Sequence, residues 1–314
     1  MNDVMILGAG ALGAFVGGRI AKAGYSVQLV NRSSSNAEVV TAKGLKVETS
    51  DETFVVHPDA VQLEQASDAR FVLVFTKTYQ SEEAINAIKA KLSPTSIIVT
   101  LQNGLGNGQR IAGYVKQSVI HGVTMIPATQ VEHGFVRSHG FSDTWFGPVD
   151  ADDQLAFSAA IELEKIMKEA GITASLIDQP LNKIWQKACF NVAMNGVCAL
   201  TDAGPGIVND IEALKREAHA LADEAVSVAN AMNARVDTEA LHNLINFACA
   251  EHRFHQPSML QDVRAGRLTE VDSLNGFVVE QAKRLGVSVP KNELMTALIL
   301  ARQVSPQFWA GQTS

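Results

Sequence analysis

The stretch Gly8-Ala9-Gly10-Ala11-Leu12-Gly13 lies between the apolar run Val4-Met5-Ile6-Leu7 and a helical pattern from Leu12 to Ala23. A strand, a glycine-rich turn and a helix in this order are typical of a site for a dinucleotide pyrophosphate. The first glycine permits the turn, the second lets the backbone approach the diphosphate, and the third lets the helix pack on the strand. Glycine-rich turns also occur where packing is merely tight, but this context favours nucleotide binding.

The end of the next apolar run indicates which nucleotide is bound. Val27-Gln28-Leu29-Val30 is followed by Asn31-Arg32-Ser33-Ser34-Ser35, so no carboxylate stands about 20 residues beyond the glycines. An acidic side chain there would bind the ribose hydroxyls, whereas arginine offers a planar fork of donors to a 2′-phosphate. A solvated loop arginine is the alternative. The place of Arg32 at a strand end favours NADP(H) over NAD(H).

The length and composition of the chain predict two domains. It has 314 residues, of which 46% are hydrophobic, and this is too long for one ordinary core. Up to about residue 178, short β-rich runs alternate with helical segments, as in a Rossmann-type doubly wound parallel sheet. Beyond that point we expect only helices. The predicted fold class is therefore α/β, with an NADP-binding Rossmann domain over 1–178 and a helical substrate and catalytic domain over 179–314.

Charge and cysteine content exclude several classes of partner. The formal net charge is −7 and no basic tract occurs, which argues against binding to nucleic acid or to an anionic membrane. The three cysteines show neither paired nor metal-ligand spacing, and the histidines lack such spacing too, so we expect reduced thiols and no metal. No targeting segment or membrane-spanning run is evident. We therefore expect a cytoplasmic protein, with a homodimer plausible from its apolar helical faces.

Individual elements of the first domain follow from the pattern. Two runs, Phe71–Phe75 and Ile97–Leu101, are expected to be buried central strands. A helix is predicted over Ser81–Leu92, with Ser81 as its cap, and Gly134–Phe146 suggests antiparallel strands added to the parallel set. Further strands are predicted at Leu45–Glu48, Thr53–His57, Val119–Val123 and Ile172–Ile177, and a helix at Gln154–Ala170. For the second domain, the predicted helices are Leu181–Leu200, Ile211–Met232, Thr238–Ala250, Ser258–Arg264 and Thr269–Leu285.

One predicted helix carries a polar stripe. Lys187, Asn191 and Asn195 are four residues apart, so each is displaced by only about 40° from the one before. Apolar residues beside them would bury most of that side, and an unpaired buried amide costs roughly 1–3 kcal/mol. A ligand could supply the missing partners. The alternative, a solvated outer face with an ordinary surface lysine, is about equally supported by this helix alone.

Other polar clusters stand near predicted strand and helix ends. Lys77 follows one central strand and Gln102-Asn103-Gly104 follows the next, at the strand ends where open α/β sheets bind ligands. In Pro257-Ser258-Met259-Leu260-Gln261-Asp262, Ser258 and Gln261 have the spacing of a capping box, as do Thr269 and Asp272. We interpret Ser258 as a helix cap and a ligand donor together.

Taken together, these motifs resemble the ketopantoate reductase (2-dehydropantoate 2-reductase) family. The resemblance rests on GAGALG, Arg32, Lys77, Gln102-Asn103-Gly104, Trp185-x-Lys187-x-x-x-Asn191-x-x-x-Asn195, and Ser258-Met259-Leu260-Gln261-Asp262 followed by Gly266-Arg267-x-Thr269-Glu270-x-Asp272. It spans both predicted domains. It implies NADPH-dependent reduction of a 2-oxo acid, in a cleft between the Rossmann and helical domains.

The resemblance also implies roles for particular residues. Lys187 would be the general acid and Glu270 a catalytic and cofactor contact near it. Asn103 would touch both nicotinamide and substrate, and Ala128 would contact the cofactor through its backbone. The implied cofactor-binding residues are Gly8, Ala9, Gly10, Ala11, Leu12, Gly13, Arg32, Lys77, Asn103, Ala128 and Glu270. The implied substrate-binding residues are Asn103, Lys187, Asn191, Asn195 and Ser258.

The physical chemistry agrees with these roles, because a nearby ammonium can stabilise and protonate the alkoxide that hydride transfer creates. Two departures leave the substrate open: no asparagine is found near Gly204-Pro205, and His255 stands where some members carry asparagine. One alternative is a reductase of a related small oxo acid. Another is a sensor that binds NADP(H) without turnover, which the presence of both Lys187 and Glu270 disfavours.

Overall fold

The computed structural model describes residues 1–310, so the tail 311–314, for which fraying was expected, lies outside the described residues. The chain forms two compact units. Unit 1 contains Met1–Gln102 and Asn107–Pro180, and unit 2 contains Asn103–Gly106 and Leu181–Ser314. The chain therefore leaves unit 1 for four residues after its central strands. The NADP-binding and catalytic roles predicted for 1–178 and 179–314 stay predictions.

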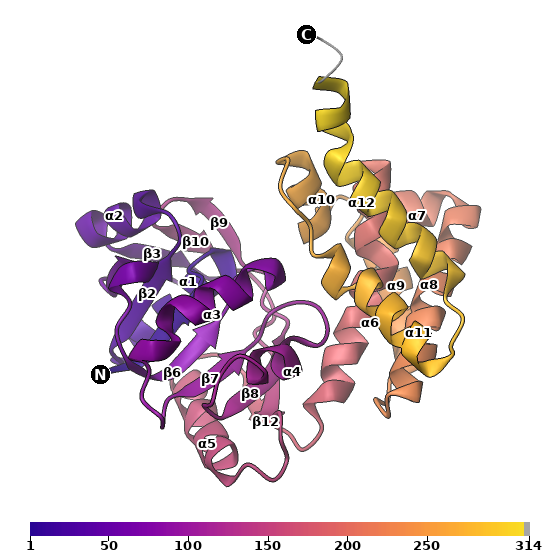
Figure 1. Cartoon of the computed structure of the whole chain (residues 1–314). Coiled ribbons are helices and arrows are strands. Elements are labelled where there is room, and N and C mark those ends of the chain that lie inside the picture. Colours follow the sequence, from indigo (N-terminus) through magenta and orange to yellow (C-terminus); the bar gives the residue numbers. More distant parts are fainter. Residues whose placement is uncertain (311–314) are drawn as a thin grey trace. The chain divides into compact units, whose positions relative to one another are not determined.

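Unit 1 is built on an eight-stranded sheet with the order β12-β11-β8-β7-β6-β1-β2-β5. Strands β2, β6, β7, β8 and β12 of this sheet are labelled in Figure 1. The strands are β1 (Asn2–Leu7), β2 (Val27–Asn31), β5 (Asp59–Gln62), β6 (Ala69–Val74), β7 (Ile97–Thr100), β8 (Val119–Thr124), β11 (Thr144–Pro148) and β12 (Ala174–Leu176). From β5 to β8 all neighbours are parallel, whereas β11 runs antiparallel to β8. The series β5-β2-β1-β6-β7-β8 has the strand order of a Rossmann fold. The predicted α/β class is confirmed.

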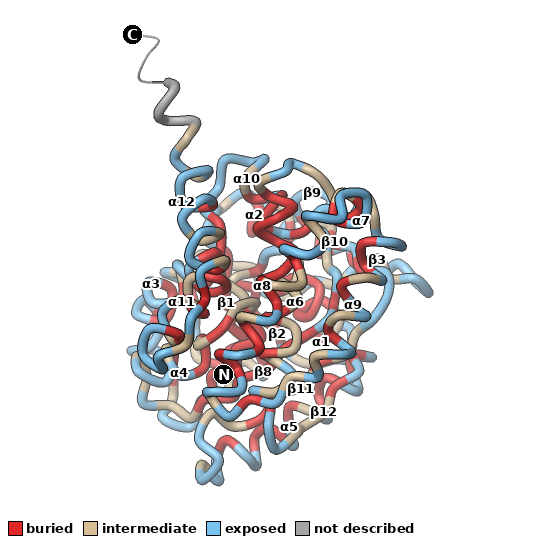
Figure 2. Tube along the Cα trace, turned by 90° about the vertical axis from the view of Figure 1, so that its right-hand side faces the viewer, coloured by how far each residue is buried: buried red, intermediate tan, exposed pale blue. Residues whose placement is uncertain are grey.

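Each face of this sheet packs against its own set of helices, because successive side chains of a strand point to opposite faces. Val4 and Ile6 belong to one core with the apolar sides of α1 and α5, whereas Met5 and Leu7 belong to another with α3 and α4. The central strands β6 and β7 are buried, as predicted. Figure 2 colours the buried residues of the chain red and the exposed ones pale blue. The helices of unit 1 are α1 (Ala11–Lys22), α2 (Ser34–Lys43), α3 (Ser81–Ile88), α4 (Asn107–Ala112) and α5 (Gln154–Glu169).

A second, four-stranded sheet corrects the expected strand arrangement. It has the order β4-β3-β10-β9, formed by β3 (Leu45–Glu48), β4 (Thr53–Val56), β9 (Thr129–Glu132) and β10 (Phe135–Arg137). Within the predicted region Gly134–Phe146, β11 does extend the main sheet, but β10 pairs in parallel with β3 of the small sheet. The third Rossmann strand is β5. It was not predicted, because the strand has only four residues and they are half-buried or exposed.

The predicted cap of helix α3 is also wrong. Ser81 is the first residue of the helix, Gln80 precedes it, and no side chain caps this end. The Ser81 hydroxyl is buried and accepts a hydrogen bond of 2.7 Å from the Gln102 amide. This tertiary bond ties the start of α3 to the end of β7.

Unit 2 is helical, and no strand occurs among its described residues. Its helices are α6 (Pro180–Thr201), α7 (Gly206–Asp210), α8 (Glu212–Ala231), α9 (Thr238–Glu251), α10 (Ser258–Arg264), α11 (Asn275–Leu285) and α12 (Pro290–Ala310). Helix α6 begins at Pro180, at the end of unit 1, as its proline at the first helical position predicts. Most of α6 is buried, and Trp185, Cys189 and Val192 contribute to the core of unit 2.

Two features of unit 2 differ from the sequence-based expectation. The predicted helix Thr269–Leu285 is broken, because Leu274 adopts φ −115° and ψ −101° between the short 3₁₀ turn Val271–Ser273 and α11. Helix α12 was not predicted. Its N-terminus is capped by Glu224 of α8, whose carboxylate accepts from the backbone N–H groups of Lys291 (3.0 Å) and Asn292 (2.9 Å). Among the described residues, no helix is long and apolar enough to cross a bilayer.

The cap of α12 predicts a stability effect. Glu224→Ala removes the acceptor for two helix N-terminal donors and for the Asn292 side-chain amide, so we expect the free energy of unfolding to fall by about 1–3 kcal/mol. Denaturant unfolding measures this. The matched control is Glu280→Ala, which removes only an exposed ion pair with Arg284 and should change stability by about 0.5 kcal/mol or less. Equal effects in the two variants would contradict the capping role.

Candidate functional site

The glycine-rich turn between β1 and α1 has the geometry that its sequence predicts. Gly8 adopts φ +99°, and a Cβ there would lie 2.6 Å from the backbone nitrogen of Thr76. A Cβ on Gly13 would lie 2.4 Å from the Gly8 carbonyl oxygen. Gly8 therefore makes the turn beside β6, and Gly13 lets α1 pack on β1.

Gly10 differs from these two glycines, because an added Cβ would meet no heavy atom within 4 Å. Packing inside the protein does not require a glycine here, so the open space suits the close approach of a ligand. Gly10 precedes α1, and the first N–H groups of an α-helix have no partner within the helix. The turn and helix start thus fit the pyrophosphate of a dinucleotide.

The end of β2 places Arg32 on the surface. Asn31 is buried and its side-chain oxygen accepts 2.8 Å from the Asn36 amide, whose own oxygen accepts from the Gly134 N–H at 3.0 Å. This chain of bonds fixes the backbone on either side of the loop. Arg32 is exposed between β2 and α2, where its guanidinium is accessible to an anionic ligand.

Lys77 and Gln102 follow neighbouring parallel strands, β6 and β7, at the same edge of the sheet. The Gln102 amide is buried and donates to the Thr76 carbonyl at 2.5 Å as well as to Ser81. Gln102 therefore joins the two strand ends rather than standing open to a ligand. Lys77 is partly buried, and Ala128, directly before β9, packs against the core of unit 1.

In unit 2 the structure brings Lys187, Asn103 and Glu270 together. Lys187 lies on α6, and its Nζ donates to Oδ1 of Asn103 at 2.8 Å. Asn103 follows β7 in the sequence but belongs to unit 2. Glu270 is buried directly before the 3₁₀ turn Val271–Ser273, and its negative charge raises the pKa of Lys187. An ammonium, an amide oxygen and a carboxylate from distant parts of the sequence thus lie close together.

The surroundings of Lys187 tune its acidity. Burial lowers the pKa of the Lys187 ammonium to about 8 from its usual 10.5, and the negative charge of Glu270 opposes this shift by raising the pKa. At neutral pH the amine therefore remains mostly protonated, but it releases a proton more easily than an ordinary lysine. A group with these properties is suited to general acid chemistry.

The polar stripe of α6 continues from Lys187 through Asn191 to Asn195. Asn191 is partly buried and Asn195 is buried. Each side-chain amide carries donor hydrogens and an acceptor oxygen. The two asparagines are therefore suited to hold a polar ligand.

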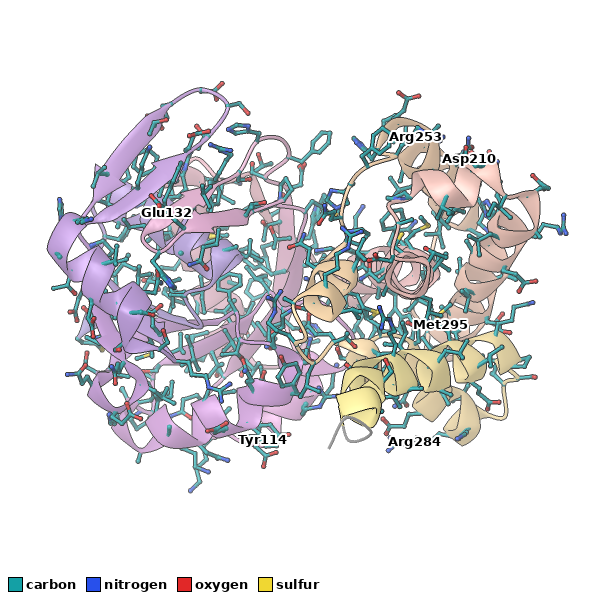
Figure 3. All side chains as sticks on the ribbon, turned by 90° about the horizontal axis from the view of Figure 1, so that it is seen from above. Tyr114, Glu132, Asp210, Arg253, Arg284 and Met295 are labelled. Atoms are coloured by element: carbon teal, nitrogen blue, oxygen red, sulfur yellow. The ribbon has the colours of Figure 1, made fainter. Side chains whose placement is uncertain are left out.

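Ser258 is exposed at the start of α10, where the predicted capping box is wrong. Pro257 precedes the helix, no side chain caps it, and Gln261 donates to the Gln256 carbonyl instead. The second predicted capping box is wrong as well, because no helix starts at Thr269. The loop before α10 is anchored by Arg253, which pairs with Asp210 of α7 at 2.6 Å (Figure 3). Proximity of Ser258 to a ligand stays a prediction.

Leu105 and Ser273, which lie next to the cluster of Lys187, Asn103 and Glu270, were not predicted from the sequence. Leu105 is buried in the core of unit 2, and its N–H donates to the Ser273 carbonyl at 2.7 Å. The glycines that flank Leu105 were the available signal, because they indicate a close approach. Their partner, some 170 residues further along, could not be inferred from spacing. Among the described residues, no three metal-ligating side chains gather to hold an ion.

Comparison with known proteins identifies the family. The model of ketopantoate reductase PanE/ApbA matches residues 4–151, and the model of the C-terminal part of the same family matches residues 180–303. A 2-dehydropantoate 2-reductase of Halobacterium salinarum is 31% identical, with 96% of this chain and 98% of the relative covered. This chain belongs to the ketopantoate reductase family. The predicted family and oxidoreductase class are confirmed.

Solved structures agree with this assignment. A PanE/ApbA family ketopantoate reductase from Ralstonia eutropha JMP134 is 27% identical and superposes with a TM-score of 0.88, covering 97% of this chain and 99% of that one. D-mandelate dehydrogenase in complex with NADH is 25% identical, with a TM-score of 0.87 and coverages of 96% and 99%. The family fold therefore includes proteins that bind a nicotinamide cofactor, as predicted for this chain.

The charge of Glu270 predicts a measurable change in Lys187. Glu270→Gln removes the effect that raises the lysine pKa, so the pKa should fall below about 8. The pH dependence of acylation of Lys187, followed by peptide mass spectrometry in protein without cofactor, measures the change. Glu280→Gln on the exposed face of α11 is the control. An unchanged or higher titration point in Glu270→Gln would show that Glu270 does not act on this amine.

Proposed function

We propose that this protein reduces a 2-oxo acid to the 2-hydroxy acid with NADPH, and that its substrate is ketopantoate (2-dehydropantoate), which becomes pantoate. Family membership supports the reaction class. The observation that carries the proposal is the 2.8 Å contact between Lys187 Nζ and Asn103 Oδ1 beside buried Glu270. These residues form a centre for protonating an oxygen, which the reduction of a ketone requires.

When bound, NADPH would supply the hydride that the carbonyl carbon accepts in the proposed reaction. The carbonyl oxygen then gains negative charge, and the Lys187 ammonium stabilises this charge and transfers a proton to it. Water restores the proton to the amine after product is released. Glu270 helps keep the lysine charged before transfer, and Asn103 accepts from Lys187 Nζ and so directs it. The hydroxy acid leaves with one hydrogen from the cofactor and one from the lysine.

The remaining predicted residues are given binding roles in this proposal. The turn Gly8–Gly13 holds the pyrophosphate, Lys77 and Ala128 contact other parts of the cofactor, and Arg32 binds the 2′-phosphate. Asn191, Asn195 and Ser258 hydrogen-bond to the oxo acid, with Ser258 on its carboxylate. The reaction requires the nicotinamide bound by unit 1 and the amine of unit 2 to meet the same carbonyl group.

A second candidate is the reduction of a different oxo acid. The likeness to D-mandelate dehydrogenase, at a TM-score of 0.87, supports it, since that protein acts on a hydroxy acid with an aromatic group. The histidine at position 255 also departs from the asparagine of some family members. A panel of 2-oxo acids with NADPH distinguishes the candidates. Turnover of phenylglyoxylate without turnover of ketopantoate would favour the second.

The role of Lys187 can be tested directly. Lys187→Met keeps the length of the side chain but removes the acid, so kcat for ketopantoate should fall by about 10²–10⁴-fold, while the Kd for NADPH changes little. Steady-state kinetics and cofactor fluorescence measure both quantities. Lys183→Met, an exposed position on the same helix, is the matched control and should retain activity. Full activity in Lys187→Met would remove this residue from the mechanism.

Cofactor preference provides a further test. Arg32→Asp replaces the proposed phosphate ligand with a carboxylate that repels the phosphate and can bind ribose hydroxyls. The Kd for NADPH should rise by about 10- to 100-fold, with a much smaller change for NADH. Titration of both cofactors against the wild type and the variant measures the difference. Equal changes for the two would mean that Arg32 does not bind the 2′-phosphate.

A further inference from the structure

Ser273 is a buried serine of the 3₁₀ turn Val271–Ser273, with 2% of its surface exposed, and it makes two kinds of backbone contact. Its Oγ and its N–H both donate to the Glu270 carbonyl, at 3.0 and 3.1 Å. Its own carbonyl accepts from the Leu105 N–H at 2.7 Å. Ser273 thus touches the turn that carries Glu270 and the segment that carries Asn103.

The segment Asn103–Gly106 is fitted closely to this serine and its neighbours. Leu105 is 1% exposed and lies in the core of unit 2. Gly104 adopts φ +90°, and a Cβ there would lie 2.6 Å from the Ser273 Oγ. Gly106 adopts φ +74°, and a Cβ there would lie 2.4 Å from the Phe277 ring. Each residue that follows Asn103 in the segment is therefore fixed against the turn or against α11.

We propose that Ser273 is a positioning residue of the Lys187 centre, because it fastens Asn103 and Glu270 to one buried turn and so sets both partners of the amine. Ser273 acts through these two residues and is given no contact with substrate. The proposal rests on the proposed function only for the catalytic use of Lys187. The arrangement itself lies within unit 2 and can be tested without cofactor or substrate.

The chemistry explains why such a support would matter. The charged form of a buried lysine is stabilised by acceptors that are already in place, and this stabilisation weakens as they move away. A catalytic group misplaced by about 1 Å can lose roughly 10²-fold in rate. Loosening Asn103 or Glu270 should therefore lower the pKa of Lys187 and reduce kcat.

The first test removes the Ser273 hydroxyl. Ser273→Ala should move the pH at which Lys187 becomes half acylated to a lower value in cofactor-free protein, and should reduce kcat by about 3- to 10-fold. The matched control is Ser227→Ala, an exposed serine of α8 whose Oγ also donates to a backbone carbonyl, that of Asp223 at 2.9 Å. The control should keep the wild-type titration and kcat.

The second test displaces the Asn103 segment while the serine remains. Gly104→Ala introduces the contact with Ser273 at a left-handed position, and we expect about a 10²-fold loss of kcat together with a lower Lys187 titration point. Gly24→Ala is the control for backbone strain. Gly24 adopts φ +95° in unit 1, but a Cβ there meets no heavy atom within 4 Å. It should lose stability without any change in Lys187.

The readouts separate this proposal from the proposed function. A lowered Lys187 titration point in Ser273→Ala and Gly104→Ala supports the positioning role, even if the wild type fails to reduce ketopantoate, which would overturn the substrate assignment alone. Titration points in folded Ser273→Ala and Gly104→Ala that equal those of their controls would overturn the positioning role, whatever the substrate. Thermal unfolding of each variant establishes that the compared proteins are folded.

Discussion

The desolvation of one ammonium group is the constraint on which the arrangement around Lys187 in unit 2 depends. A charged amine loses favourable hydration when it is buried, and its pKa falls unless acceptors replace the water. Asn103 and Glu270 provide this replacement for Lys187 in part, because its pKa is still lowered to about 8. The result is a group that is charged near neutrality and ready to give up a proton. A fully solvated lysine would hold its proton more tightly.

The glycine-rich turn of unit 1 depends on a different constraint, which is the close approach of one backbone segment to another. Gly8 has no room for a side chain beside β6, and Gly13 has none beside the turn itself. These contacts fix the start of α1 at the end of β1, so that its N-terminal N–H groups are presented together. Gly10 stands apart, since nothing in the protein fills the space beside it. Folding therefore requires glycine at Gly8 and Gly13, whereas at Gly10 only a ligand would require it.

Features with a local cause could be predicted from the sequence, and those with a distant cause could not. The glycine turn, the buried strands β6 and β7 and the polar stripe of α6 all follow from spacing within one element. Ser81 and Thr269 have the sequence pattern of helix caps, yet Ser81 instead accepts from Gln102 and the helix expected at Thr269 is broken. The approach of Glu270 to Lys187 was predicted from a family resemblance, because residue spacing carries no information about it, and the bond between Lys187 and Asn103 was not predicted. No feature of the sequence predicted the contacts of Ser273 with Glu270 and Leu105.

The path of the chain around Asn103 explains how the Lys187 group stays together. Asn103 comes only three residues after β7, and from sequence it would be assigned to the Rossmann sheet. Its neighbours instead pack in unit 2, where Leu105 is buried and bonded to Ser273. The bond between Lys187 and Asn103 is therefore internal to unit 2. Because Glu270 belongs to the same unit, unit 2 supplies the Lys187 amine and both of its partners.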